Sequence, residues 1–463
     1  MNKRRIKEYA VSYSFLLPFA VFFITFTIIP IGYVFYLSLH DGNFLQAQFD
    51  WVGLKNFKDV LQTPDFQNAF KNTFIYMLIE VPVSQFLGIF FALLIKKKTR
   101  FGHVCEVIYF LPMLISMVVA SVLISYILSN NGPLNMLFQV LGMKPISWLN
   151  GRFSAKMAVM ILELWKGGTF FVFVYMSAMR SLPADCLESS RIDGANVVQE
   201  TIYVVLPLIR NAIILCVTMN TIWQFQIFES VYMLTNGGPL GATQTVIYEI
   251  YQYSFKYYRV GFGAAASLVF LLVILLIYGL ENLLLREKDK TRRRGKRMNR
   301  YRVKKKVFSF LKTFMLFLLV VIIAFPFWQL IVSSMLDTNA IISYPPKFWP
   351  SGGSLDNYTE VLKMQGGAYL RWMLNSVFVA GSNTVLVVLV ASMAGYAFAK
   401  RRFPGSKVLF NVVVATQIIP SVTTLIPLFL IVSKLGWVNT GKPLIITSFP
   451  FRQVLPALPV SLL

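Results

Sequence analysis

Long runs of apolar residues, separated by short polar or Pro/Gly-rich segments, dominate the chain from end to end. A bilayer core about 30 Å thick is crossed by roughly 20 mostly apolar residues in a helix, and each run is long enough for this. We therefore expect six membrane-spanning helices in the first part of the chain, at 13–38, 71–95, 105–128, 157–179, 204–235 and 262–285. Three or four more are expected later, at 307–335, 373–399, 408–433 and, if a fourth is formed, 443–463.

The composition supports the bilayer as the main solvent. Of the 463 residues 56% are hydrophobic and only 14% are charged, and the mean hydropathy is +0.62. Soluble globular domains carry roughly 25% charged residues and fewer apolar ones. The expected fold class is therefore an all-α polytopic membrane protein, with a six-helix unit followed by three to four helices of a second unit.

The basic residues indicate how the chain is oriented. Thirteen of the 44 lysines and arginines lie within 286–306, between two apolar runs. If the N-terminus is cytoplasmic, the inside segments hold 28 basic residues and the outside segments hold 13. Because basic residues favour the cytoplasmic side, we expect a cytoplasmic N-terminus, and we interpret the basic block as an inter-helix loop. The net charge of +24 therefore does not predict nucleic-acid binding.

An internal repeat divides the chain. The segment Gly53–Leu61 is matched in order by Ser354–Leu362, about 301 residues later, and both lie after the first apolar run of their part. Matches at polar loop positions indicate a duplicated membrane unit rather than a chance similarity between apolar helices. The second copy begins near Met298, where a basic N-terminal sequence recurs.

The repeat predicts two domains of unequal completeness. Residues 1–297 are expected to form a complete six-helix unit, and residues 298–463 an incomplete second one. The segment 441–463 holds four prolines where further spans would follow, and it resembles a frameshifted or truncated tail.

The segment 181–207 is the most informative part of the chain. Between two expected spans it predicts a short amphipathic helix, a turn at Gly194 and a second helix leading into the next span. Glu188 and Arg191 are three residues apart and can pair on one helical turn. Asp193 is expected to cap the second helix, and glycine permits a sharp reversal. Because both ends of the segment are fixed to membrane helices, we interpret it as a mechanical docking element.

This segment resembles the EAA loop of ABC importer permeases of the maltose and multiple-sugar type. The family's Glu-Ala-Ala, Asp-Gly-Ala and distal Leu-Pro are matched by Glu188, Asp193, Gly194, Ala195, Leu206 and Pro207. Ser189 and Ser190 replace the two alanines. The aromatic residue that the family usually has before the distal proline is absent at Val198 and Thr201. Most of the chain up to about residue 440 is similar to the same family.

The resemblance implies a multi-pass permease of the bacterial plasma (inner) membrane that imports sugars or oligosaccharides. In that family, the loop forms coupling helices in a cleft of a separate ATPase subunit, whose dimer closes around ATP and drives alternating access. The implied partners are a cytoplasmic ATPase dimer, a second permease subunit, an extracellular or periplasmic sugar-binding protein and membrane lipid. The implied ATPase-coupling residues are Glu188, Ser189, Ser190, Arg191, Asp193, Gly194, Ala195 and Pro207.

The sequence offers no chemistry of its own for ATP hydrolysis. No Gly-x-x-x-x-Gly-Lys-Ser/Thr motif occurs, so ATP is expected on the separate subunit and no cofactor on this chain. The two histidines and three cysteines show no metal-ligand spacing. We therefore expect neither an enzyme nor a metal site.

A sugar path needs amides and carboxylates beside aromatic faces, because a sugar presents many hydroxyl groups. The expected fifth span supplies these types in Trp223, Gln224, Gln226 and Glu229. Glu80 and Glu163 also fall within expected spans, where polar groups usually face a cavity or each other. An ion-coupled secondary transporter is the alternative, but it would favour acidic residues at matched positions of both repeats. Glu80 has no acid near the corresponding position around Ala380.

Overall fold

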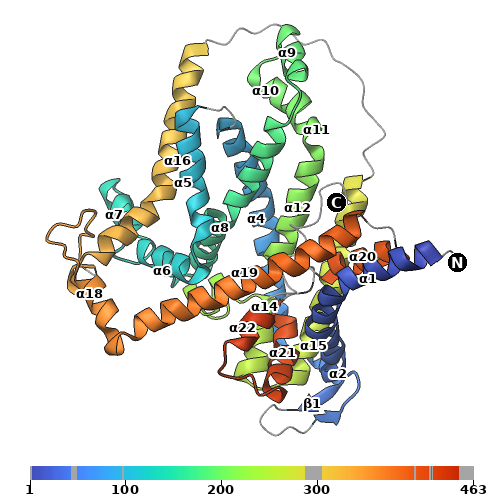
Figure 1. The fold of residues 1–463 in the computed structure, drawn as a ribbon. Helices are drawn as coiled ribbons and strands as arrows, with labels where there is room; N and C mark the ends of the chain where they lie inside the picture. The colour runs from blue at the N-terminus through green and yellow to red at the C-terminus, as the bar shows by residue number, and fades with distance from the viewer. Residues whose placement is uncertain are drawn as a thin grey trace. The chain divides into compact units, whose positions relative to one another are not determined.

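The computed structural model describes residues 3–42, 49–95, 99–286, 305–341, 343–400, 403–416, 419 and 421–447. Most of the basic block and all of the chain after residue 447 lie outside the described residues. The described part is almost entirely helical (Figure 1). Its strands β1 (His40–Gly42) and β2 (Phe49–Trp51) pair antiparallel, with Asp41 opposite Asp50.

The helices up to residue 286 fall into long apolar helices and short connecting ones. In order they are α1 (Lys3–Phe23), α2 (Ile29–Ser38), α3 (Lys55–Gln62), α4 (Pro64–Ile95), α5 (Arg100–Leu114), α6 (Met117–Ile127), α7 (Pro133–Val140), α8 (Arg152–Arg180), α9 (Ala184–Ile192), α10 (Val197–Glu200), α11 (Leu206–Leu208), α12 (Arg210–Phe225), α13 (Glu229–Leu234), α14 (Val246–Tyr251) and α15 (Val260–Arg286). The later helices are α16 (Lys305–Ser334), α17 (Thr338–Ile341), α18 (Asp356–Lys363), α19 (Ala368–Lys400), α20 (Ser406–Thr416), α21 (Ser421–Lys434) and α22 (Lys442–Ile446).

Within the described residues, six helices are long and apolar enough to cross a membrane. They cover Tyr9–Ser38, Pro64–Ile95, Arg152–Arg180, Val260–Glu281, Thr313–Ser334 and Ala368–Lys400. Two bent pairs pass the same test together: α5 with α6, bent by 104°, and Val197–Leu208 with α12, bent by 75°. Six of the expected spans are therefore found as single helical runs, and two others are found as bent pairs.

Three expected spans were wrong as continuous helices. The span at 105–128 breaks at Ser116, because the extended backbone of Ile115 ends α5 and the Ser116 side chain caps α6. The span at 204–235 is divided because α12 ends at Phe225, and Phe228, with φ −139° and ψ −57°, separates it from α13. The span at 408–433 is divided between α20 and α21.

Two π-helical turns precede prolines. Segment η1 (Ile24–Ile28) lies before Pro30, and segment η2 (Thr201–Val205) lies before Pro207. A proline has no N–H and cannot donate to the carbonyl four residues back, so the preceding turn widens. In each case the residue after the widened turn donates to the carbonyl five residues earlier, as Leu206 does to Thr201. A third π-helical turn, η3 (Gln252–Lys256), follows α14, and a short 3₁₀ turn, η4 (Met364–Gly366), follows α18.

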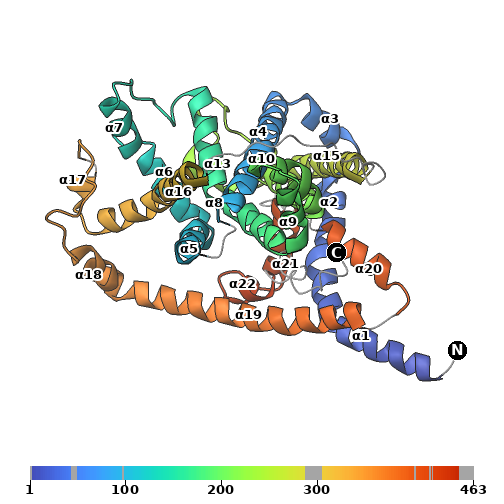
Figure 2. The same cartoon turned by 90° about the horizontal axis from the view of Figure 1, so that it is seen from above.

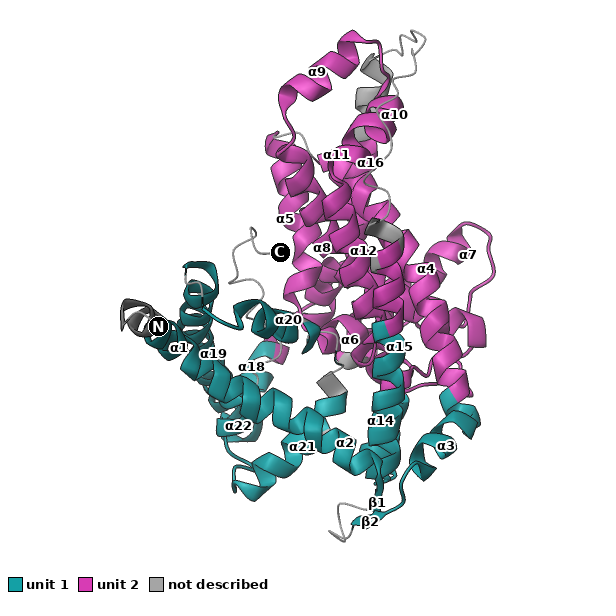
Figure 3. Cartoon of the chain, turned by 90° about the vertical axis from the view of Figure 1, so that its right-hand side faces the viewer, with its two compact units in different colours: residues 1–66, 249–275, 358–463 teal, residues 67–248, 276–357 magenta. Residues whose placement is uncertain are grey.

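The chain packs as two compact units (Figure 3). One comprises 1–66, 249–275 and 358–463, and the other comprises 67–248 and 276–357. Each unit combines segments from before and after residue 297. These units describe packing, and the predicted sequence repeat stays a prediction.

In the first unit, α1 packs against the C-terminal half of the long helix α19 (Figure 2). Phe19 and Phe23 share an apolar cluster with Ala394 and Ala397, whose small side chains favour close approach of the two helices. A second core joins α2 to α15 through Leu37 and other apolar side chains.

In the second unit, α8 lies at the centre and contacts α5, α6, α12 and α13. Its Phe171 and Tyr175 are among the largest fully buried side chains. Helix α16 packs on α5 and α6, and the indole Nε1 of Trp165 donates to the Ile323 carbonyl at 3.4 Å.

Many large apolar side chains face outward along the candidate spans. Leu17, Phe86, Leu276 and Phe378 are each more than 60% exposed. Such exposure would be costly in water, but it is favourable against lipid tails. The outer surfaces of these helices therefore suit a bilayer.

Candidate functional site: the loop between helices α8 and α12

Helix α9 forms the first half of this loop. Pro183 precedes it, and Asp185 lies in its first turn, where a carboxylate favours the positive end of the helix dipole. The hydroxyl of Ser189 donates to the Asp185 carbonyl at 2.6 Å, and that of Ser190 donates to the Leu187 carbonyl at 2.8 Å. Both small polar residues are thus satisfied within the helix, and Ser190 is buried.

Gly194 ends α9 in a Schellman motif. Its φ is +85°, in the left-handed region where a Cβ is unfavourable. The Ala195 N–H donates to the Ser190 carbonyl at 3.0 Å, and the Gly194 N–H donates to the Arg191 carbonyl at 3.1 Å. These two bonds satisfy carbonyls at the helix end that otherwise have no partner. The predicted reversal at Gly194 is found.

Asn196 begins the second half of the loop. Its Oδ1 accepts from the Gln199 N–H at 2.9 Å, and the Gln199 side chain accepts from the Asn196 N–H at 3.0 Å. This reciprocal pair is a capping box for α10. The expectation that Asp193 caps the second helix was wrong, because Asp193 is the C-terminal cap of α9 and the chain turns before α10 begins.

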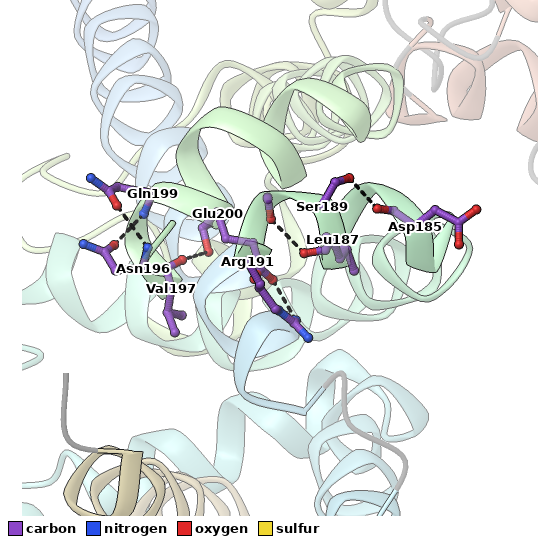
Figure 4. A network of polar contacts seen from close by, with 10 residues as sticks. Asp185, Leu187, Ser189, Arg191, Asn196, Val197, Gln199 and Glu200 are labelled. Carbon is purple, nitrogen blue, oxygen red and sulfur yellow. Dashed lines mark hydrogen bonds and ion pairs between the residues drawn. The ribbon is translucent and has the colours of Figure 1, made fainter. Parts of the chain in front are cut away.

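Arg191 binds Glu200 across the turn (Figure 4). The Nε donates to Oε2 at 2.7 Å, and Nη2 donates to Oε1 at 3.1 Å. Glu200 is only 6% exposed, and its hydrogen bonds raise the pKa of the Arg191 guanidinium above its ordinary high value. The sequence predicted that Arg191 pairs with Glu188, which is exposed, and the structure pairs it with Glu200 instead. The turn at Gly194 brings residues nine positions apart together, and helix spacing alone does not foresee this.

The loop continues through η2 and α11 to Ile209, where the helical run breaks before α12 begins. Pro207 lies in the first turn of α11, and the run bends by 75° around Ile209 before α12 begins. Helix α10 is thus joined to the start of α12 by a short, bent helical run.

Apolar side chains are exposed along the loop. Ile192 is 85% exposed, Val198 is 63% exposed and Tyr203 is 66% exposed. They alternate with polar residues, including the exposed Glu188. Exposed apolar groups rimmed by polar ones are typical of a protein–protein contact.

The residues of the expected sugar path are separated. Trp223 packs against Phe170 and Phe171, with ring centroids 5.1 and 5.5 Å apart. Gln224 is buried, and its Nε2 donates to Asn220 at 3.3 Å. Gln226 follows the end of α12, and Glu229 begins α13 as an exposed side chain. The four expected sugar-path residues therefore do not lie along one face of a continuous helix.

A buried polar cluster lies beside Gln224 in the second compact unit. Asn220 donates to the hydroxyl of Ser84 on α4. Glu80, one turn earlier on α4, is 2% exposed, and its Oε2 has no hydrogen-bond partner. Glu163 on α8 accepts from Ser230 at 2.5 Å. Ser84 and Asn220 were missed, because single small polar residues in apolar helices give no distinctive signal. No group of three or more metal-ligating side chains occurs among the described residues.

Comparisons with known proteins decide the family. Residues 84–290 match the binding-protein-dependent transport system inner membrane component family. A probable ABC transporter permease protein of Pyrococcus horikoshii is 31% identical over 273 residues, which cover 56% of this chain and 92% of that protein. The chain belongs to this family. The trehalose/maltose transport system permease protein MalF of Thermococcus litoralis is 26% identical to this permease over 280 residues, covering 60% and 92% of the two chains.

Solved structures confirm the fold class of the permease. A chain from a crystal structure of a bacterial alginate ABC transporter in complex with an alginate pentasaccharide-bound periplasmic protein aligns with a TM-score of 0.56 at 23% identity. The alignment covers 62% of this chain and 98% of that one. The all-α polytopic permease fold is thereby confirmed, and the family match and the relatives confirm the resemblance to sugar ABC importer permeases. Because the family consists of membrane permeases, its members are not enzymes.

Proposed function

We propose that this chain is the transmembrane permease component of an ABC importer that moves sugars or oligosaccharides into the cytoplasm by alternating access. MalF of Thermococcus litoralis and an arabinooligosaccharides transport system permease protein of Bacillus subtilis, 28% identical over 275 residues and covering 58% and 86% of the two chains, support a sugar as the cargo. Relatives named as ABC transporter permeases favour this function over an ion-coupled secondary transporter.

The loop from α9 to α11 carries the proposal. It is a helix–turn–helix held by a Schellman motif, a capping box and an ion pair, and it exposes apolar side chains. This combination suits docking to a separate ATPase dimer, which would bind the ATP. The proposed contact residues are Glu188, Ser189, Ser190, Arg191, Asp193, Gly194, Ala195 and Pro207.

The remaining partners follow from the family and the surface. A sugar-binding protein outside the membrane would deliver the cargo, a second permease subunit would complete the pore, and lipid would cover the exposed apolar side chains. We propose a bacterial inner-membrane location with a cytoplasmic N-terminus, based on the distribution of basic residues. Trp223, Gln224, Gln226 and Glu229 stay a proposal for the sugar path.

We also propose that residues from about 298 form a second unit related to 1–297. Asn56 in α3 donates through Nδ2 to the carbonyls of Ser38 and His40 at 3.0 and 2.8 Å. Asn357 in α18 donates in the same way to Ser334 and Leu336 at 3.0 and 2.9 Å. In each copy the asparagine bonds the carbonyl of the last residue of a helix, α2 or α16, and the carbonyl two residues later. Equivalent bonds at equivalent positions support a duplication.

Gly194→Val tests the coupling role of the loop. The substitution places a β-branched residue at φ +85°, so the turn should distort and α9 should lose its position. In proteoliposomes with the ATPase and binding protein, we expect sugar uptake to fall by at least about tenfold while ATP hydrolysis persists.

Gly142→Val is the matched control. Gly142 has φ +75° and ends α7 in another Schellman motif, with Met143 donating to Phe138 at 2.8 Å, and a Cβ there would meet nothing within 4 Å. Both variants carry similar backbone strain, but only one lies in the loop. Unaltered uptake in Gly194→Val, or equal losses in both variants, would contradict the proposed coupling.

A further inference from the structure

The Arg191–Glu200 pair joins the two halves of the loop by side chains. Arg191 lies in the last turn of α9, and Glu200 is the last residue of α10. The two hydrogen bonds of 2.7 and 3.1 Å are bidentate, and this planar fork fixes direction as well as distance. The Arg191 side chain is 58% exposed, whereas the Glu200 side chain is 8% exposed. The Glu200 carboxylate therefore accepts hydrogen bonds from the Arg191 guanidinium and is largely shielded from water.

The segment between the halves is short and turns sharply. Only residues 193–196 separate α9 from α10, and Gly194 lies in the left-handed region. The backbone bonds of the Schellman motif end within α9, and those of the capping box end within α10. Neither motif spans the turn, and across it Leu187 of α9 and Leu206 of α11 pack on one apolar cluster that contains Val205. The Arg191–Glu200 pair adds a directional polar tie across the turn, which non-directional apolar packing does not supply.

We infer that the Arg191–Glu200 pair is a positioning element that makes α9 and the run from α10 to α12 move as one piece. Force applied to α9 then reaches α12 through a rigid joint. Without the pair, α9 can swing about Gly194 while α12 stays in place. This inference rests on the proposed docking of an ATPase to the loop, and it assigns to Arg191 a role within the loop in addition to contact with the partner.

Four variants distinguish the contributions of the two charges, of the bidentate geometry and of the pairing itself. Arg191→Gln and Glu200→Gln each remove one charge. Arg191→Lys keeps the charge but loses the bidentate fork. The double variant Arg191→Glu with Glu200→Arg restores a pair with reversed polarity. The readout is the number of sugar molecules transported for each ATP hydrolysed, in proteoliposomes that contain the complete transporter and its binding protein.

The expected result is a loss of coupling with intact docking. Both single charge removals should lower the ratio of transport to hydrolysis by about tenfold, the lysine variant should lower it less, and the double variant should recover most of it. Docking is measured separately by cross-linking the exposed Cys186 of α9 to lysines of the ATPase with a maleimide–succinimide reagent. The cross-link should persist above all in Glu200→Gln, because the Glu200 side chain is 8% exposed and lies outside the proposed contact residues.

Arg180→Gln is the matched control. Arg180 of α8 makes a similar two-bond contact with Glu106 of α5, at 3.0 and 3.4 Å, but that pair joins two long helices outside the loop. Its loss should leave the coupling ratio within about twofold of the unsubstituted protein. A merely structural role for Arg191 would lower the protein yield without changing the ratio.

The outcomes separate the inference from the proposed function. Unchanged ratios in Arg191→Gln and Glu200→Gln, with the cross-link present, overturn the inference alone. A missing cross-link in the unsubstituted protein overturns the docking and the inference with it. If the single variants do not assemble, failure of the well-assembled double variant to restore coupling also overturns the inference.

Discussion

At the residue scale, three side chains set the geometry of the loop. Gly194 permits the reversal, Asn196 starts the next helix, and Arg191 ties the two helices together. Each acts through a different physical cause: backbone freedom, satisfaction of N–H groups at a helix start, and a charge-assisted fork. Their effects should therefore be separable by substitution.

Asn196→Ala should loosen the start of α10. The variant removes the oxygen that accepts from Gln199, at a cost of about 1 kcal/mol of local stability. Amide hydrogen exchange of residues 197–201 should be faster by about fivefold in the variant. Asn196→Asp retains the accepting oxygen and should exchange like the unsubstituted protein. Equal exchange in all three proteins would contradict the capping role.

Glu249 should make the stability of the protein depend on pH. This α14 residue lies outside the candidate spans, and burial, aided by the negative charge of Asp65, raises the pKa of its carboxyl from 4.5 to about 7. The folded protein therefore holds a proton that the unfolded chain releases. The stability that this bound proton contributes to the folded protein is fully present below pH 4.5 and is lost as the pH rises through 7.

Glu249→Gln should remove this dependence. In the unsubstituted protein, the midpoint of thermal unfolding in detergent should fall between pH 5 and pH 8. The corresponding loss in the free energy of unfolding is at most about 3 kcal/mol. The amide does not titrate, so the variant should show a flatter profile. Glu360→Gln alters an exposed carboxyl of α18 and should keep the original slope. A Glu249→Gln profile as steep as the original would contradict this assignment.

At the element scale, apolar run length predicts where helices lie but not where they break. Runs such as 71–95 and 157–179 match α4 and α8 closely, because a bilayer sets a minimum length. The break at Ser116 depends on one hydroxyl that caps α6 inside an otherwise apolar run. The end of α12 at Phe225 has no such marker in the sequence.

The loop shows the same division between local and distant causes. The turn at Gly194 could be predicted, and the Asn-x-x-Gln spacing of the capping box was also available in the sequence. The partner of Arg191 could not be predicted, since a contact over nine residues exists only after the turn has formed. The separation of the expected sugar-path residues likewise follows from the break after α12.

At the scale of the whole molecule, the family and the fold agree. The match over residues 84–290 contains the complete loop and its flanking helices. The matched asparagines Asn56 and Asn357 support a second unit of the same kind. The central claim is that the loop from α9 to α11 receives an ATPase on the cytoplasmic side.

Cross-linking from Cys186 tests this claim most directly. Cys186 is exposed on α9, whereas Cys105 and Cys216 are buried, so the native chain offers one reactive thiol at the required place. In inside-out vesicles with the assembled transporter, a maleimide–succinimide reagent should join this chain to the ATPase, and Cys186→Ser should abolish the product. Labelling of Cys186 only from the opposite face, or no product while the ATPase co-purifies, would contradict the account.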